Sequence, residues 1–66
     1  MKIFIYKFEV EYIDKHGKII VKEYNNIVES RITGKGLYLT DLDGKMIGPI
    51  QNVQKVNSHF QKLIEE

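Results

Sequence analysis

The sequence predicts a small β-rich fold, a five-stranded antiparallel sheet with one helix at the C-terminus. Two observations lead to this fold class. The motif Asp-x-x-Gly-Lys occurs twice, at 14–18 and 41–45, and each copy lies between stretches rich in Tyr, Ile or Leu. The tail then carries apolar residues at helical spacing. We therefore expect two tight hairpins followed by a helix.

Each Asp-x-x-Gly-Lys motif has the chemistry of a short hairpin loop. The Asp side chain accepts backbone hydrogen bonds within the turn, and the Gly adopts the left-handed conformation that closes it. If Asp14 faces Lys18, the register pairs Phe8 with Tyr24, Val10 with Lys22 and Tyr12 with Ile20. The strands are then expected at about 2–13, 18–25, 27–33, 37–41 and 45–50.

Side chains alternate along the first strand, and this assigns two faces. The face predicted to enter the core is aromatic and consists of Phe4, Tyr6, Phe8, Val10 and Tyr12. The opposite face carries apolar residues diluted by Glu9, Glu11 and Glu23, so its middle is expected to be wetter. Glu9 would lie opposite Glu23. In an open sheet, this second face would leave an exposed apolar patch that fits a protein interface: Ile3, Ile5, Ile19 and Val21.

Two further segments bear on the sheet. Residues 33–36, Thr-Gly-Lys-Gly, predict a turn between the third and fourth strands. Pro49 has no N–H to donate, so the fifth strand is expected either to lie at an edge of the sheet or to end at this residue.

The tail is apolar at offsets of three, four, three and one residues, which predicts a helix over about 52–65. Asn52 would cap this helix. A shorter helix could instead begin at Ser58, with Gln61 completing a capping box. The residues that form the apolar stripe are Val53, Val56, Phe60, Leu63 and Ile64.

Length and composition predict one domain, residues 1–66, in a reducing compartment. The chain has 66 residues and no cysteine, so neither a disulfide nor a cysteine zinc site stabilises it. The apolar run at 3–6 is shorter than a signal peptide requires, and no stretch has the length of a membrane span. We therefore expect a cytoplasmic protein that does not associate with membranes.

No pattern in the sequence indicates catalysis, a metal site or a cofactor. His16 and His59 have no partner at ligand spacing, and 41–44 lacks the remaining ligands of a calcium loop. The run Gly34-Lys35-Gly36 is too short for a phosphate-binding loop. The sequence therefore predicts a protein that is not an enzyme, with no catalytic residues.

The charge balance favours a small binding module, regulatory or inhibitory, that acts on a protein partner or on itself. Ten Lys and Arg against nine Asp and Glu give a net charge of +1, which is modest for a nucleic-acid-binding protein. The alternative is nucleic-acid binding through the sheet. Clustering of the basic residues on one face would favour that alternative, and interspersion with acids would favour a protein partner. The basic residues concerned are Lys7, Lys18, Lys22, Arg31 and Lys35.

The order of elements resembles two groups of DNA-binding domains. We expect the sheet to be strongly curved or closed as an SH3-like barrel. Two hairpins and a C-terminal helix are similar to the small SH3-like chromatin proteins of archaea. Those proteins are far more basic and use a Trp, whereas this chain has none. The segment 36–41, then Gly44-Lys45 and the expected helix, also looks like the three-stranded-sheet-plus-helix domains of some integrases.

Overall fold

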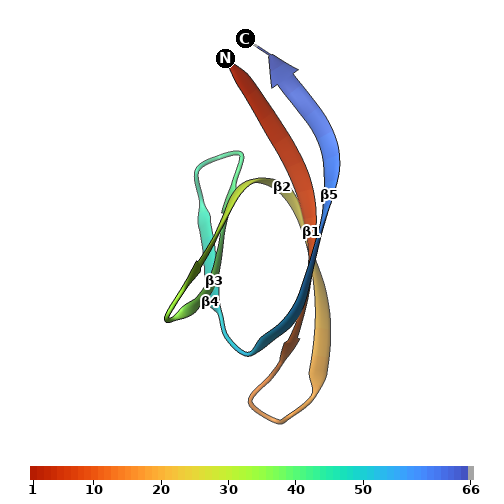
Figure 1. The fold of residues 1–66 in the computed structure, drawn as a ribbon, viewed down its shortest axis with the longest axis vertical. Coiled ribbons are helices and arrows are strands. Elements are labelled where there is room, and N and C mark those ends of the chain that lie inside the picture. The colour runs from red at the N-terminus through yellow and green to blue at the C-terminus, as the bar shows by residue number, and fades with distance from the viewer. Residues whose placement is uncertain (66) are drawn as a thin grey trace.

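The computed structural model describes residues 1–65 and contains five antiparallel strands in one sheet (Figure 1). The strands are β1 (Lys2–Ile13), β2 (Ile19–Thr33), β3 (Gly36–Asp41), β4 (Met46–Ile50) and β5 (Val53–Glu65). Their order across the sheet is β4-β3-β2-β1-β5. The five-stranded antiparallel sheet is confirmed.

Both Asp-x-x-Gly-Lys hairpins form as predicted. The Asp14 carboxylate accepts the N–H groups of His16 and Lys18, at 2.8 and 3.0 Å. Asp41 repeats these bonds at 3.0 and 2.8 Å in the second hairpin. The turn glycines have φ angles of 79° and 83°. The register of the first hairpin is also confirmed, including the pairs Phe8–Tyr24 and Glu9–Glu23.

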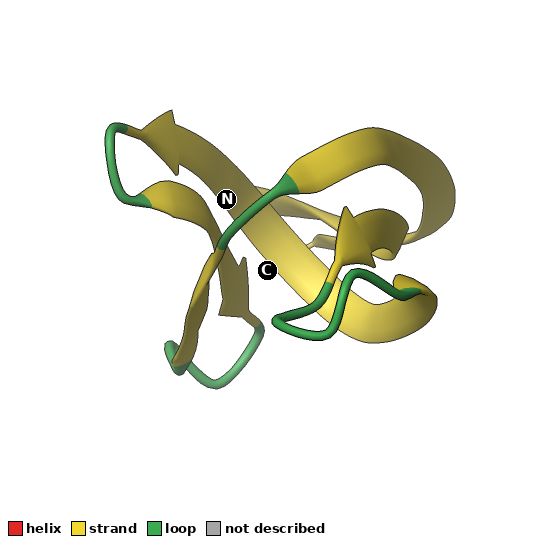
Figure 2. Ribbon diagram, turned by 90° about the horizontal axis from the view of Figure 1, so that it is seen from below, coloured by secondary structure: helices red, strands yellow, loops and turns green. Residues whose placement is uncertain are grey.

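The strands expected at 18–25 and 27–33 are one continuous strand, β2, which bends sharply. Tyr6 pairs with Ile27 and Phe8 with Tyr24, so two β2 residues, Asn25 and Asn26, oppose the single β1 residue between them. This bulge places Asn26 at φ 58°, a left-handed conformation that Asn tolerates well. Bulges bend a strand, and β2 therefore pairs first with β1 and then with β3 (Figures 1 and 2).

The predicted C-terminal helix is wrong, because residues 53–65 form strand β5, which pairs with β1 along its length. The apolar spacing arises from two bulges. Glu11 pairs with Lys55 and Tyr12 with Val53, which leaves Gln54 as an extra residue, and Gln61 is extra in the same way. Each bulge lengthens the strand repeat from two residues to three. Residues on one face of β5 thus recur at helix-like intervals: Val53, Val56, Phe60 and Leu63.

Backbone pairing gives a physical reason for the strand. Without β5, the second edge of β1 would have no partner, whereas each N–H and C=O in a ladder is satisfied. The valines, Asn57 and Ser58 are weak helix formers, so little opposes the extended state. Because residues 53–65 form a strand, the resemblance to sheet-plus-helix domains fails at its last element.

No helix in residues 1–65 has the length and apolar character to cross a bilayer.

The core lies between the bent sheet halves and draws on β1 to β4. The six buried residues that form it are Phe8, Val10, Ile27, Leu37, Leu39 and Ile50. Tyr6, Tyr12 and Tyr24 pack against this cluster from the aromatic face, as expected. Phe4 departs from the prediction, since it is half exposed. Pro49 lies in β4, an edge strand, as its missing N–H predicts.

Candidate functional site

The first residues of β1 and the last of β5 form a two-stranded ribbon that extends beyond the other strands (Figure 1). Lys2 to Ile5 pair with residues 62–65 of β5, whereas pairing of β1 with β2 begins only at Tyr6. An ion pair of 3.5 Å between Lys2 Nζ and Glu65 Oε1 joins the two strands at the tip. The ribbon makes the molecule elongated, with extents of 44 × 20 × 15 Å.

One face of this ribbon is apolar and exposed. Phe4 pairs with Leu63 and Tyr6 with Phe60, so these side chains lie on the same face. The Phe60 ring lies 6.2 Å from the Phe4 ring and 6.0 Å from the Tyr6 ring, in tilted and edge-on arrangements. Phe4, Phe60 and Leu63 remain 49%, 58% and 39% exposed. We call these three residues the ribbon face.

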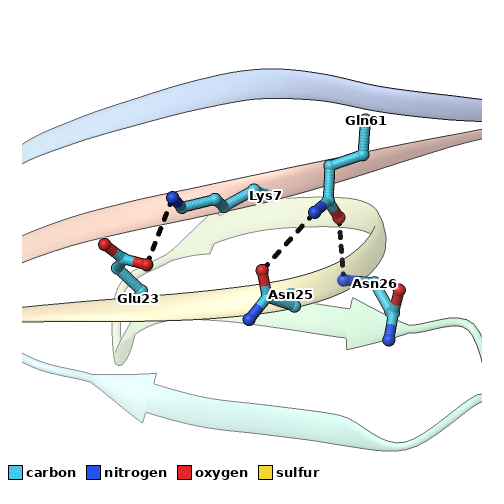
Figure 3. Close-up of polar contacts among 5 residues, drawn as sticks. All are labelled: Lys7, Glu23, Asn25, Asn26 and Gln61. Atoms are coloured by element: carbon cyan, nitrogen blue, oxygen red, sulfur yellow. Dashed lines mark hydrogen bonds and ion pairs between the residues drawn. The ribbon is translucent and has the colours of Figure 1, made fainter.

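Gln61 connects the base of the ribbon to β2 (Figure 3). Its side chain reaches across β1, where Oε1 accepts the Asn26 N–H at 3.3 Å and Nε2 donates to Asn25 Oδ1 at 3.5 Å. The bulge residue of β5 is thus bonded to the bulge of β2. Both bulges lie beside Tyr6, so β2 and β5 are irregular at the same level of β1, where the ribbon begins.

The free edge of β5 is poorly suited to pairing with another strand. β5 is the last strand of the sheet, and it carries Lys55, Lys62 and the two bulges. Lysines and bulges on an edge strand oppose edge-to-edge association. The ribbon face, rather than the strand edge, is therefore the part of β5 suited to contact.

The structure does not bring together the four residues predicted as a protein interface. Ile5 is fully buried and Ile3 is half buried, both in the ribbon part of β1. Ile19 and Val21 are exposed but lie at the other end of β1, opposite Ile13 and Glu11. Of the four predicted residues, only Ile19 and Val21 are thus exposed.

The five predicted basic residues are spread over the molecule. Lys7 Nζ lies 3.2 Å from Glu23 Oε2 (Figure 3), and Lys22 Nζ lies 5.6 Å above the Tyr24 ring. Lys18 follows the first turn and donates its backbone N–H to Asp14. Arg31 and Lys35 line one hollow, in which Glu29 also lies. Basic and acidic side chains are therefore interspersed.

That hollow has a volume of about 670 Å³ and lies over β2, the β2–β3 turn, β3 and β4. The residues that line it are Glu29, Arg31, Thr33, Gly34, Lys35, Tyr38, Thr40 and Met46. A second hollow, of about 490 Å³, lies beside the first hairpin and includes Tyr12, Tyr24 and His16. Burial, and to a lesser degree the neighbouring Tyr12, raises the pKa of Tyr24 above its ordinary value.

No group of three or more potential metal ligands occurs in the described part of the chain. His16 lies at the tip of the first hairpin and His59 on β5, opposite Lys7.

Sequence reasoning missed the ribbon face because it assigned Phe60 and Leu63 to a helix and Phe4 to the core. The signal available was the β-branched and aromatic content of 53–64, which favours a strand. Comparisons of the chain with protein-family models, with curated proteins and with solved structures found no match.

Proposed function

We propose that the chain is a non-catalytic binding module that contacts another protein through the ribbon face. The observation that carries this proposal is the exposed ring pair of Phe4 and Phe60, with Leu63 beside them. Contiguous exposed apolar side chains on a small protein mark interaction sites more often than isolated ones do. Aromatic residues are also enriched where protein interfaces are buried.

The shape of the ribbon supports the same proposal. The face projects past β2, so a partner can approach it without meeting the rest of the sheet (Figure 1). Val56 is also partly exposed on the same face of β5, and Ser58 separates it from Phe60. The charged tip, where Lys2 pairs with Glu65, supplies the polar rim that such surfaces usually have.

Site-specific photo-crosslinking tests this proposal. A crosslinking amino acid at position 60 should yield a discrete protein adduct in the native cells, whereas the same group at position 19 should not. Ile19 is a matched control because it is exposed, apolar and distant from the ribbon. An adduct of twice the chain mass identifies a second copy as the partner. The change Phe4→Ser should reduce the adduct at position 60, and equal adducts at positions 60 and 19 contradict the proposal.

Nucleic-acid binding through the sheet is the second candidate function, and the hollow with Arg31 and Lys35 favours it. Against it, Lys7 is paired with Glu23 and the basic residues do not gather on one face. Titration with a random duplex at low and physiological salt tests it. Changes in the amide signals of the basic residues of β2, with binding that weakens steeply as salt rises, would support phosphate contacts. No shifts at low salt would exclude this function.

Closure of the sheet outside the ribbon as an SH3-like barrel is a related proposal about the fold. We call this part of the sheet the body. The bend of β2 and the strand order support it. A cytoplasmic location stays a prediction.

A further inference from the structure

The hollow over β2, β3 and β4 has the size of a small-molecule site and lies outside the core. Its volume of about 670 Å³ is within the usual range of ligand pockets. Arg31 pairs with Tyr38 across the two strands, so both side chains lie on one face. Leu37 and Leu39 alternate with Tyr38 on β3 and enter the core, which places the hollow on the outer face.

The two cations of this hollow have no protein partner within residues 1–65. The side chains of Arg31 and Lys35 make neither an ion pair nor a hydrogen bond there, whereas Lys2 and Lys7 are each paired with a glutamate. A guanidinium has five N–H donors in a planar fork that matches the oxygens of a phosphate. The hollow therefore presents unused donors to an incoming anion.

The backbone at one end of the hollow is held in place by Thr33. Thr33 Oγ1 accepts the Lys35 N–H at 3.1 Å and donates to the Gly36 carbonyl at 3.3 Å. The backbone of Lys35 is thus held in a turn, and its side chain lines the same hollow as Arg31. Glu29 lies two residues before Arg31 on β2, on the side away from Lys35, so an anion is repelled from that end and attracted to the turn.

We propose that this hollow binds a phosphate monoester. The phosphate dianion lies between Arg31 and Lys35, and the organic group lies against Tyr38 and Met46, which supply the apolar wall. A free phosphorylated small molecule and a phosphorylated side chain share this chemistry. The site is separate from the ribbon face, so either proposal can fail without the other.

NMR titration of the labelled chain at physiological salt tests the site with four probes: inorganic phosphate, phenyl phosphate, a phosphotyrosine peptide and its unphosphorylated form. We expect saturable amide shifts at Arg31, Lys35 and Tyr38, with phenyl phosphate binding more tightly than inorganic phosphate. Tighter binding of the phosphopeptide than of phenyl phosphate assigns the site to side chains, and equal binding assigns it to free monoesters. Absence of saturable shifts with every phosphorylated probe overturns the proposal.

Charge-removing variants locate the site. Arg31→Gln and Lys35→Gln should each weaken phenyl phosphate binding about tenfold, the effect of losing one charge-assisted hydrogen bond. Lys18→Gln and Lys22→Gln change the net charge equally on the first hairpin and should leave binding unchanged. Equal weakening by all four variants would show general attraction to a basic protein and would overturn the site.

Discussion

Strand β1 runs through two regions of the molecule. One face of the strand is buried in the first region and exposed in the second. From Phe8 to Ile13 it lies between β2 and β5, and the side chains of Phe8 and Val10 are buried in the core. From Lys2 to Ile5 it pairs only with β5, and Phe4 on that face is half exposed. Pattern and residue type are alike in the two regions. What differs on this face is the opposing layer from β3 and β4, which covers Phe8 and Val10 and leaves Phe4 uncovered.

Matched leucine substitutions test this difference most strongly. Leu39→Ala removes a fully buried side chain from the core and should lower the free energy of unfolding by about 2–5 kcal/mol. That loss is a large part of the net stability of a domain of this size, roughly 3–5 kcal/mol, so the unfolding transition should move to a much lower urea concentration. Leu63→Ala on the ribbon should cost about 1 kcal/mol or less. Urea denaturation followed by circular dichroism measures both, and equal losses would contradict the division into two regions.

A glycine pair tests how closely the backbones pack in the body. A Cβ on Gly36, which has φ 133°, would lie 2.5 Å from the Ile50 carbonyl oxygen of β4. Gly36→Ala should therefore lower the free energy of unfolding by about 1–3 kcal/mol. Gly34→Ala is the control, because a Cβ there meets nothing within 4 Å. It should change stability by less than about 0.5 kcal/mol in the same urea experiment. A Gly36→Ala variant as stable as the control would show that β3 and β4 separate easily.

Gln61→Ala tests the junction between body and ribbon. It removes two exposed side-chain hydrogen bonds, so the loss of stability should be about 1 kcal/mol or less. The sharper readout is local: hydrogen exchange of the Asn26 amide should accelerate, while amides in the first hairpin keep their rates. Gln54→Ala is the control at the other bulge, where the side chain bonds only to nearby Asn52. An Asn26 amide with unchanged exchange would show that Gln61 does not join the two bulges.

The smallest expected effect is on alkaline stability. Burial raises the pKa of Tyr24 in the folded chain, so the unfolded chain loses that proton first as pH rises. Stability contributed by this group is therefore complete below about pH 10 and is lost above it. Thermal unfolding between pH 8 and 11 should show a decline that is shallower in Tyr24→Phe than in the unsubstituted chain. Identical slopes would mean that Tyr24 is as hydrated folded as unfolded.

The hairpins were predictable because their determinants are local. Asp14 and Asp41 each organise a turn through bonds to residues two and four positions away, and the register then follows from the turn. Such short-range chemistry is visible in one stretch of sequence. Residues 53–65 are different, because their conformation depends on pairing with β1, some fifty residues earlier. Two bulges then gave an extended strand the apolar spacing of a helix.

The candidate site was less predictable than the fold. Phe4 and Phe60 become neighbours only through the β1–β5 pairing, which a helix in the tail would have prevented. Ile5, expected on an open face, is fully buried. Alternation assigns the residues of a strand to two faces, but it does not show which of them the folded chain covers. Arg31 and Lys35 were identified from their charge, but the hollow that they share depends on how β3 and β4 pair beside β2.

The bond between the two bulges also has a geometric consequence. Gln61 on β5 and Asn25–Asn26 on β2 lie on either side of β1, at the level where the ribbon leaves the body. A small rotation at this level becomes a large displacement at the tip, as with any lever. The bonds of Gln61 to Asn25 and Asn26 would thus help to set the angle at which Phe4 and Phe60 are presented to the partner proposed above. The orientation of a bound partner relative to the body would then depend on Asn25, Asn26 and Gln61.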